Sequence, residues 1–134
     1  MEKDFKKWHQ EKEVLHKDKE RIFFHEREVW WSYLGVNIGF EQDGKGENFE
    51  RPVVIFKKFN NEIFWAIPLT TKNKKGKYYQ KIKLTTIDNL VIKRTVILSQ
   101  LRLVDAKRLN DKMGVADRVD FLEIKKAISS IVLE

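Results

Sequence analysis

Two residues near the middle of the chain, Arg51 and Thr70, have the types and the spacing to hold a phosphate group. Arg51 stands at the start of the apolar run 52–57, and Thr70 follows the apolar run 62–69. The residues at 59–61 are Phe-Asn-Asn, which suit a tight turn with φ > 0, so the runs are expected to pair as an antiparallel hairpin. The start of one strand then lies beside the end of the other, and Arg51 and Thr70 become neighbours at one rim of the sheet.

A guanidinium beside a hydroxyl suits a phosphate because one group is permanently charged and the other is an adjustable hydrogen-bond donor. The planar guanidinium fork can bind two phosphate oxygens at once. Each residue also has a structural explanation. Arg51 could simply cap a strand end whose geometry Pro52 fixes, and Thr70 and Thr71 could simply begin a polar loop.

Other chemistry finds less support in the sequence. The chain has no cysteine, which excludes disulfides, thiolate zinc sites and a cysteine nucleophile. His9, His16 and His25 all lie near the N-terminus, and His9 and His16 would share one helix face. No third ligand has a suitable spacing, and nothing places two imidazoles across a cleft for acid–base catalysis. No metal ion and no cofactor are therefore expected.

Positive charge is concentrated in the centre of the chain. The net charge is +7, and residues 57–94 alone carry 10 basic and 2 acidic residues. Such a surface attracts polyanions, either nucleic acid or an acidic protein, although a solvated loop that aids solubility would have the same composition. Six lysines mark the stretch: Lys72, Lys74, Lys75, Lys77, Lys81 and Lys83.

The chain of 134 residues fits one domain, 1–134, of the mainly β class with helices (α+β). Residues 3–24 lack Gly and Pro and carry an apolar stripe, which predicts an N-terminal helical extension. The segments 28–34, 52–57, 62–69, 78–84 and 95–104 are short and rich in β-branched and aromatic residues, which predicts about five antiparallel strands in a small barrel. Several runs are apolar on both faces, as expected when helices pack outside such a barrel.

The C-terminal part returns to helical spacing. Residues 105–111 could form a short turn of helix, and Asp117 is the expected N-cap of a longer one. In that helix we expect six apolar side chains to be mostly buried: Val119, Leu122, Ile124, Ala127, Ile128 and Ile131. The uncharged runs are too short to span a bilayer, and the N-terminus alternates charges, so a soluble cytoplasmic protein is expected.

Five short motifs follow one another along the chain. They are Arg27-Glu28-Val29-Trp30-Trp31, Gly39-Phe40-Glu41-Gln42, Arg51-Pro52-Val53-Val54-Ile55, Pro68-Leu69-Thr70-Thr71 and Ile97-Leu98-Ser99-Gln100-Leu101-Arg102, the last followed by Asp105 and Lys107-Arg108-Leu109. In this order and spacing the sequence resembles the MazF/PemK family, the toxins of type II toxin–antitoxin systems, over roughly residues 27–125.

The resemblance implies a fold and an activity. The fold would be a small SH3-like barrel of the CcdB/PemK type with a C-terminal helix, spanning 27–134 and paired into a homodimer. The activity would be metal-independent cleavage of single-stranded RNA at a short sequence, leaving 2′,3′-cyclic phosphate and 5′-OH ends. A cognate acidic antitoxin would neutralise it.

The resemblance also implies roles for individual residues. Arg51 and Thr70 match the catalytic pair, Glu41 and Gln42 match a loop that closes over RNA, and Gln100 matches a position near the site. Together with the charge pattern, it makes the loop after Thr70 a candidate RNA contact through Thr71, Lys72, Lys74, Lys75 and Lys77.

The chain departs from the family pattern in three places. Arg27 replaces a glycine, the loop 43–50 is longer than is common, and the extension 3–24 lies outside the match.

Two other functions stay open from the sequence. The first is a toxin of the same fold that poisons gyrase, as CcdB does. CcdB acts through a Trp-Gly-Ile ending, whereas this chain ends Ser-Ile-Val-Leu-Glu. The second is a non-catalytic barrel that binds nucleic acid or protein, with Arg51 as a phosphate clamp. Five aromatic residues could then stack on bases, although aromatic residues in strands more often belong to the core: Trp30, Trp31, Trp65, Tyr78 and Tyr79.

Overall fold

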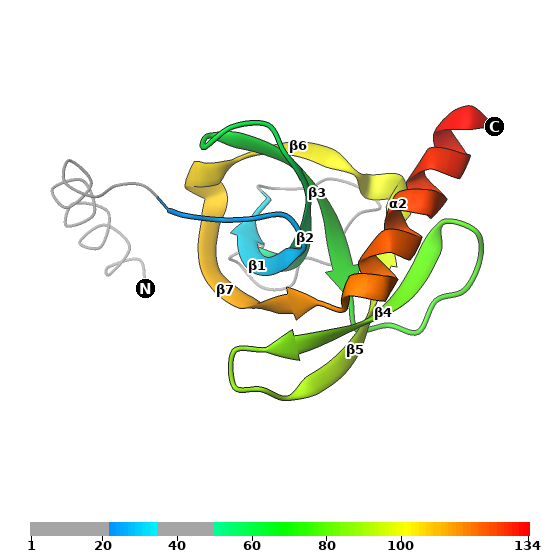
Figure 1. The fold of residues 1–134 in the computed structure, drawn as a ribbon, viewed down its shortest axis with the longest axis horizontal. Helices are drawn as coiled ribbons and strands as arrows, with labels where there is room; N and C mark the ends of the chain where they lie inside the picture. The colour runs from blue at the N-terminus through cyan, green and yellow to red at the C-terminus, as the bar shows by residue number, and fades with distance from the viewer. Residues whose placement is uncertain (1–21, 35–49) are drawn as a thin grey trace, which may run out of the picture.

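The computed structural model describes residues 22–34 and 50–134 of the chain. Within these two ranges, seven strands, two 3₁₀ turns and one helix follow in order (Figure 1). They are β1 (Glu28–Tyr33), β2 (Glu50–Lys58), β3 (Ile63–Thr70), β4 (Tyr79–Thr86), β5 (Val91–Ile97), η2 (Leu98–Gln100), β6 (Arg102–Asp105), η3 (Ala106–Arg108), β7 (Leu109–Ala116) and α2 (Arg118–Leu133).

Six of the strands close into an antiparallel barrel. Their order is β2-β1-β7-β4-β5-β3, and the pairing of β2 with β3 closes the ring. β3 has two partners on its second edge, because its first half pairs with β6 and its last two residues, Leu69 and Thr70, pair with β5. This architecture confirms the expected mainly β barrel with a C-terminal helix.

The middle strands are apolar on both faces because each face packs in a different core. Val54 of β2 lies in a core with Val29, Ile67 and the buried side of α2. Val53 and Ile55, on the opposite face, lie in a second core with Phe24, Phe64 and β6. The uninterrupted apolar run of β2 therefore follows from double burial.

The β2–β3 hairpin forms as predicted, but its turn closes differently. Val53 lies opposite Pro68, and Lys58 lies opposite Phe64. Asn60 accepts hydrogen bonds at Oδ1 from the main-chain N–H groups of Glu62 (2.7 Å) and Ile63 (2.9 Å). Among the described non-glycine residues, positive φ occurs at Arg27 and Asn89 and not in this turn. The expectation of φ > 0 at 59–61 was wrong, because the Asn60 side chain joins main-chain bonds to the Ile63 carbonyl in closing the turn.

The region 95–104 is not one strand. β5 begins earlier, at Val91, and η2 interrupts the chain before β6. The main-chain N–H of Leu98 donates to the carbonyl of Tyr78 at 2.8 Å, and the Leu98 side chain is buried. Before the turn, β5 pairs with β4, and after it β6 pairs with β3. The spacing of apolar residues could not reveal this change of partner.

Residues 105–111 contain only a single 3₁₀ turn, η3, after which the chain forms β7, a strand that the sequence analysis missed. β7 contains Asp111, Lys112 and Gly114, which weaken its strand pattern. The glycine is needed by packing, because a Cβ at position 114 would lie 2.3 Å from the main-chain oxygen of Thr85. β7 is therefore set by its pairing with β1 and β4.

The C-terminal helix begins as predicted. The Asp117 side chain accepts a hydrogen bond from the main-chain N–H of Asp120 at 3.1 Å. The buried stripe was partly wrong, since Val119 and Leu122 are exposed and Phe121 is buried with Ile124 and Ile128. The helix packs only one narrow face on the barrel, and Phe121 rather than its neighbours fills that contact.

The predicted helix 3–24 lies mostly outside the described residues. Its last part, 22–24, has no helical structure, so the prediction was wrong there. Phe24 is instead fully buried against Phe64, with ring centroids 4.9 Å apart, and it anchors the chain to the second core before β1 begins. Within the described ranges, no helix is long and apolar enough to cross a membrane.

Candidate functional site

Arg51 is the second residue of β2, where the strand enters the barrel. Its side chain is only 6% exposed, and Nη2 donates a hydrogen bond to the main-chain oxygen of Leu69 at 3.2 Å. Because Val53 pairs with Pro68, the same register two residues further places Arg51 opposite Thr70. The structure thus brings the two residues together at one rim of the hairpin.

Thr70 is the last residue of β3, and its side chain is partly exposed. Its Oγ1 accepts a hydrogen bond from the main-chain N–H of Lys72 at 3.1 Å, which fixes the start of the following loop. A hydroxyl that accepts one bond still carries its own proton. Thr70 can therefore donate to an oxygen of a bound group while it holds the loop in place.

Arg51 and Thr70 belong to a polar row that crosses five strands. Ser32 pairs with Arg51, Thr70 pairs with Thr95, and Thr95 pairs with Lys81. Directly paired residues of antiparallel strands share one face of the sheet. Ser32, Arg51 and Thr95 are the only polar or charged side chains of the described residues that are buried in the fold. The concentration of buried polar groups in one row marks it as the candidate site.

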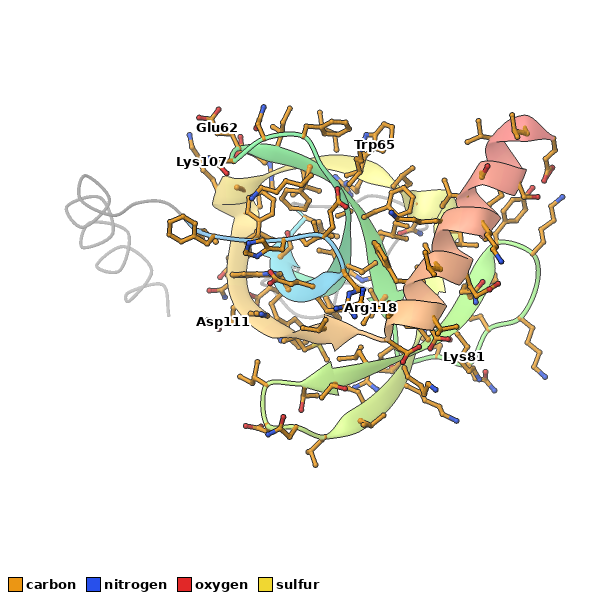
Figure 2. The ribbon with its side chains drawn as sticks, in the orientation of Figure 1. Glu62, Trp65, Lys81, Lys107, Asp111 and Arg118 are labelled. Atoms are coloured by element: carbon orange, nitrogen blue, oxygen red, sulfur yellow. The ribbon has the colours of Figure 1, made fainter. Side chains whose placement is uncertain are left out.

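The row has positive charge at two places and no described carboxylate or imidazole. Arg51 supplies one cation inside the sheet, and Lys81 supplies an exposed one on β4. Lys81 lies far from the β2–β3 turn, where Glu62 is labelled (Figure 2). Its Nζ donates to Oδ1 of Asn73 at 2.7 Å, which connects the row with the β3–β4 loop. The row is suited to binding an anion rather than to acting as a carboxylate base.

The β3–β4 loop continues directly from Thr70 and is exposed throughout. Two of its lysines lie over tyrosine rings, with Lys74 Nζ 5.8 Å from the Tyr79 centroid and Lys77 Nζ 5.3 Å from the Tyr78 centroid. The hydrogen bond from Lys77 to Glu134 raises the pKa of this lysine. The structure places Thr71, Lys72, Lys74, Lys75 and Lys77 together on this loop, next to the site.

The other residues that the sequence analysis singled out do not belong to the polar row. Gln100 lies in the turn η2 and not on a strand, and η2 packs beside β3, β4 and α2. Glu41 and Gln42 lie outside the described residues. His9 and His16 do as well, whereas His25 is exposed. In the ranges 22–34 and 50–134, no group of three His, Asp or Glu side chains could hold a metal ion.

Glu28, at the start of β1, is held in a hydrogen-bonded cage. Its carboxylate accepts from Trp30 Nε1 (2.9 Å), from the main-chain N–H of His25 (2.9 Å) and from Lys112 Nζ (3.1 Å). Burial alone would raise the pKa of Glu28, but these bonds, with the charge of Lys112, outweigh it and hold the pKa below its ordinary value. The group is thus a fixed anion that ties β1 to β7.

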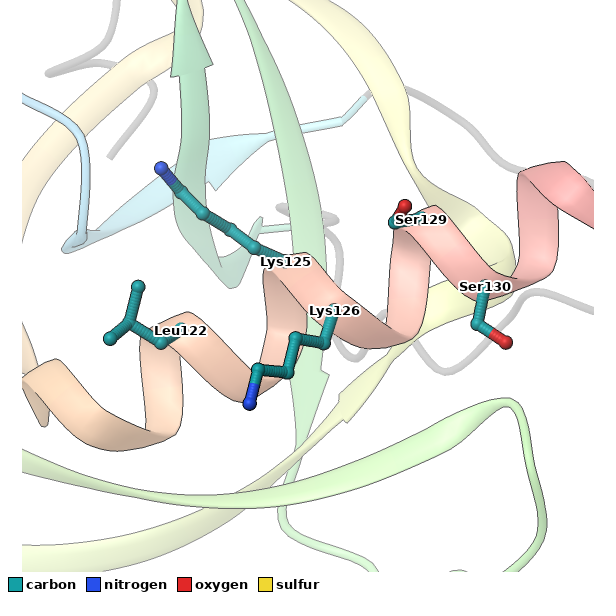
Figure 3. A pocket seen from close by; sticks show the side chains of 5 residues that line it. All are labelled: Leu122, Lys125, Lys126, Ser129 and Ser130. Carbon is teal, nitrogen blue, oxygen red and sulfur yellow. The ribbon is translucent and has the colours of Figure 1, made fainter.

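A separate hollow runs along the outer side of α2 and is lined by Leu122, Lys125, Lys126, Ser129 and Ser130 (Figure 3). None of its residues belongs to the polar row. The hollow is open and lies along a single helix, so it has no convergent polar groups of the kind that fix a small ligand.

A family model for PemK-like, MazF-like toxins of type II toxin–antitoxin systems matches residues 26–132. The chain belongs to this family. The match includes all seven strands, most of α2 and the whole polar row. No curated protein is similar enough to the chain to be matched. PemK/MazF toxins are generally ribonucleases that are paired with an antitoxin.

Of the polar row, the sequence analysis identified Arg51 and Thr70 as site residues but neither Ser32 nor Thr95. A weak signal existed for Ser32, which is a small polar residue inside a strand of aromatic residues. Its meaning depends on the β1–β2 pairing, because only that register places Ser32 beside Arg51.

Proposed function

We propose that this PemK/MazF toxin is a sequence-specific, metal-independent endoribonuclease that cleaves single-stranded mRNA. The observation that carries the proposal is the placement of the Arg51 guanidinium against the Leu69 carbonyl, opposite Thr70, within a row of buried polar groups. Burying a guanidinium costs free energy unless its N–H groups are hydrogen-bonded, and its planar fork matches the oxygens of a phosphate.

The proposed reaction uses a nucleophile from the RNA. The 2′-OH attacks the neighbouring phosphorus and passes its proton to water as the new P–O2′ bond forms. The P–O5′ bond breaks, and the leaving oxygen takes up a proton. The products are a 2′,3′-cyclic phosphate and a 5′-OH. No change of oxidation state and no further reactant is involved.

The protein's part is to stabilise the charge that builds on the non-bridging oxygens. Arg51 supplies a permanent positive charge, and it can hydrogen-bond the leaving oxygen while that oxygen takes up a proton from water. Thr70 donates a hydrogen bond to the same phosphate. Since Thr70 is partly exposed and Arg51 is 6% exposed, the phosphate meets Thr70 first, and the guanidinium has to turn toward it. Such preorganised donors commonly account for about 10²–10³ in rate each.

Other parts of the protein would bind the RNA and the antitoxin. The exposed lysines of the β3–β4 loop contact the RNA backbone, and Glu41, Gln42 and Gln100 take the RNA-binding roles that the family resemblance implies. The protein acts in the cytoplasm as a homodimer, and an acidic antitoxin segment covers the basic surface. Charge complementarity supports this partner, because residues 57–94 carry 10 basic and 2 acidic residues.

The test is incubation of the purified protein with a single-stranded RNA in EDTA. The expected result is cleavage with 2′,3′-cyclic phosphate ends, together with binding but no cleavage of the DNA of the same sequence. RNA binding without cleavage would instead indicate a barrel that only binds, and gyrase poisoning would indicate a CcdB-like target. Cleavage that EDTA abolishes would contradict the metal-independent mechanism.

A further inference from the structure

Ser32 on β1 has a buried hydroxyl that no described group satisfies. The residue is 0% exposed, and no hydrogen-bond partner from the described residues lies within reach of its Oγ. Buried side-chain hydroxyls in folded proteins are nearly always hydrogen-bonded, because losing water without gaining a partner destabilises the fold. An unsatisfied buried hydroxyl therefore calls for an explanation.

Among the described residues next to Ser32 in the sheet, one has a charged side chain. Along its own strand, the residues on the same face are Trp30 and Leu34, and both are buried apolar residues. Across the β1–β7 pairing it lies opposite Leu109, which is also buried. Across the β1–β2 pairing it lies opposite Arg51, in a register that runs without interruption over five residue pairs. Arg51 is the natural partner of this hydroxyl.

The Arg51 guanidinium can donate hydrogen bonds to acceptors on either side of β2. In the present arrangement Nη2 donates to the carbonyl of Leu69, on the β3 side of β2. Ser32 lies on the other side, on β1. A guanidinium has five N–H donors in a rigid plane, so turning one edge toward a phosphate presents the other edge to a new acceptor. The Ser32 Oγ can serve as that acceptor.

We propose that Ser32 is a positioning residue for Arg51, with a hydroxyl that accepts a hydrogen bond from the guanidinium when Arg51 turns toward the scissile phosphate. The proposal rests on the proposed ribonuclease function. Ser32 acts through Arg51 and does not itself touch the RNA. Its unsatisfied hydroxyl destabilises the RNA-free protein, and the missing interaction is regained only in the transition state, where it increases the rate.

The test is Ser32→Ala, which removes the hydroxyl and leaves a side chain that the apolar surroundings accept. Thermal unfolding of the RNA-free protein and steady-state cleavage of an RNA oligonucleotide are measured on the same preparations. We expect the melting temperature to rise by roughly 2–5 °C, since a buried unsatisfied group has been removed. We expect kcat to fall about 10- to 100-fold with KM little changed, since a hydrogen bond to a charged group is lost only in the transition state.

The matched control is Ser129→Ala, which removes an exposed serine hydroxyl from α2 and should alter neither quantity. A merely structural Ser32 would lower the melting temperature, and that result overturns the proposal. Unchanged kcat in Ser32→Ala, with the wild type active, overturns it while leaving the ribonuclease function standing. A wild-type protein that does not cleave RNA overturns both.

Discussion

The Arg51 guanidinium and the Leu69 main-chain oxygen are joined by a hydrogen bond of 3.2 Å across the β2–β3 hairpin. Leu69 directly precedes Thr70, so this bond places the buried cation beside the hydroxyl at the end of β3. A main-chain acceptor is fixed by the sheet and cannot move away with a side chain. In the RNA-free protein the barrel's main chain therefore holds the Arg51 guanidinium, and replacing the arginine should change the chemistry more than the fold.

We expect Arg51→Ala to reduce RNA cleavage at least 10²–10³-fold, because it removes the charge that stabilises the pentacovalent phosphate. The loss of the bond to the Leu69 carbonyl should by itself lower the free energy of unfolding by about 1–2 kcal/mol. Cleavage rates and urea unfolding of the same preparation distinguish the two effects. Arg118→Ala, at an exposed arginine on α2, is the control and should cleave normally. A folded Arg51→Ala protein with full activity would remove Arg51 from the site.

Thr70→Val should slow cleavage by about 10²-fold, because it replaces the hydroxyl with a methyl group of similar size. The variant also loses the bond from the main-chain N–H of Lys72, which should cost about 1 kcal/mol of folding free energy. Single-turnover cleavage with enzyme in excess measures the chemical step. Thr85→Val, at an exposed position of β4, makes the same change outside the row and should leave the rate unaltered. Equal rates for both variants would show that the Thr70 hydroxyl has no part in the reaction.

The lysines of the β3–β4 loop should act through charge rather than through base recognition. Replacing Lys74 and Lys75 with Gln should make the log–log dependence of RNA affinity on salt less steep by up to about 1.4, or about 0.7 for each phosphate that the variant no longer neutralises. The double replacement of Lys125 and Lys126 on α2 removes the same charge elsewhere and should leave the slope closer to that of the wild type. This slope is measured by RNA-binding titrations between about 50 and 300 mM salt, a range over which the Debye length falls from about 14 to 6 Å. A slope unchanged by the loop replacement would exclude the loop as the surface that binds RNA.

The parts of the fold that were predictable from sequence are those whose signal is local. β2 and β3 are apolar on both faces and are joined by a short turn, so their pairing and the meeting of Arg51 with Thr70 followed from the order of residues. Asp117 was recognisable as a cap because its acceptor serves a main-chain N–H three residues away.

The elements that were missed depend on partners distant in the chain. β7 has polar residues and a glycine, and it forms a strand because β1 and β4 present free edges on either side. Ser32 and Thr95 join the row only through pairings with β2 and β3. Neither residue is unusual in its own segment, so their common face could be seen only after the barrel had been assembled.

The cage around Glu28 should make stability depend on pH in a defined direction. Its pKa is lowered in the folded protein, so its contribution is present above the ordinary value of 4.5 and is lost as the pH falls through the folded-state value. Glu28→Gln should therefore lower the free energy of unfolding by about 1–2 kcal/mol at pH 7, and the difference from the wild type should shrink below pH 4.5. Urea unfolding between pH 3 and pH 7 (roughly the range in which carboxylates titrate) measures it.

Glu123→Gln is the matched control for Glu28. Its carboxylate forms an exposed pair with Lys126 at 3.6 Å, and such pairs contribute little. We expect the unfolding free energy of this variant to follow that of the wild type across the same pH range. A difference between Glu28→Gln and the wild type that stays constant down to low pH would show that packing, and not the charge, accounts for the effect of Glu28.

At position 27, a glycine variant should be more stable than an alanine variant, which is the reverse of the usual order. The φ of Arg27 is +82°, a conformation that costs an L-residue with a Cβ about 1–2 kcal/mol and costs glycine almost nothing. Its main chain is fixed on both sides, since its N–H donates to Ile55 and its carbonyl accepts from Ala116. The residue therefore cannot relax to negative φ without breaking the barrel's hydrogen bonds.

The Arg27 side chain offsets part of this strain, because Nη1 donates to the Ala116 carbonyl at 2.9 Å. Arg27→Ala keeps the strain and loses that bond, whereas Arg27→Gly loses the bond and the strain together. We expect Arg27→Gly to be more stable than Arg27→Ala by about 1 kcal/mol, although in an ordinary strand position glycine is the less stable of the two by about 0.5–1 kcal/mol. Urea unfolding of the two variants decides the sign, and a more stable alanine variant would mean that the strain is absent in solution.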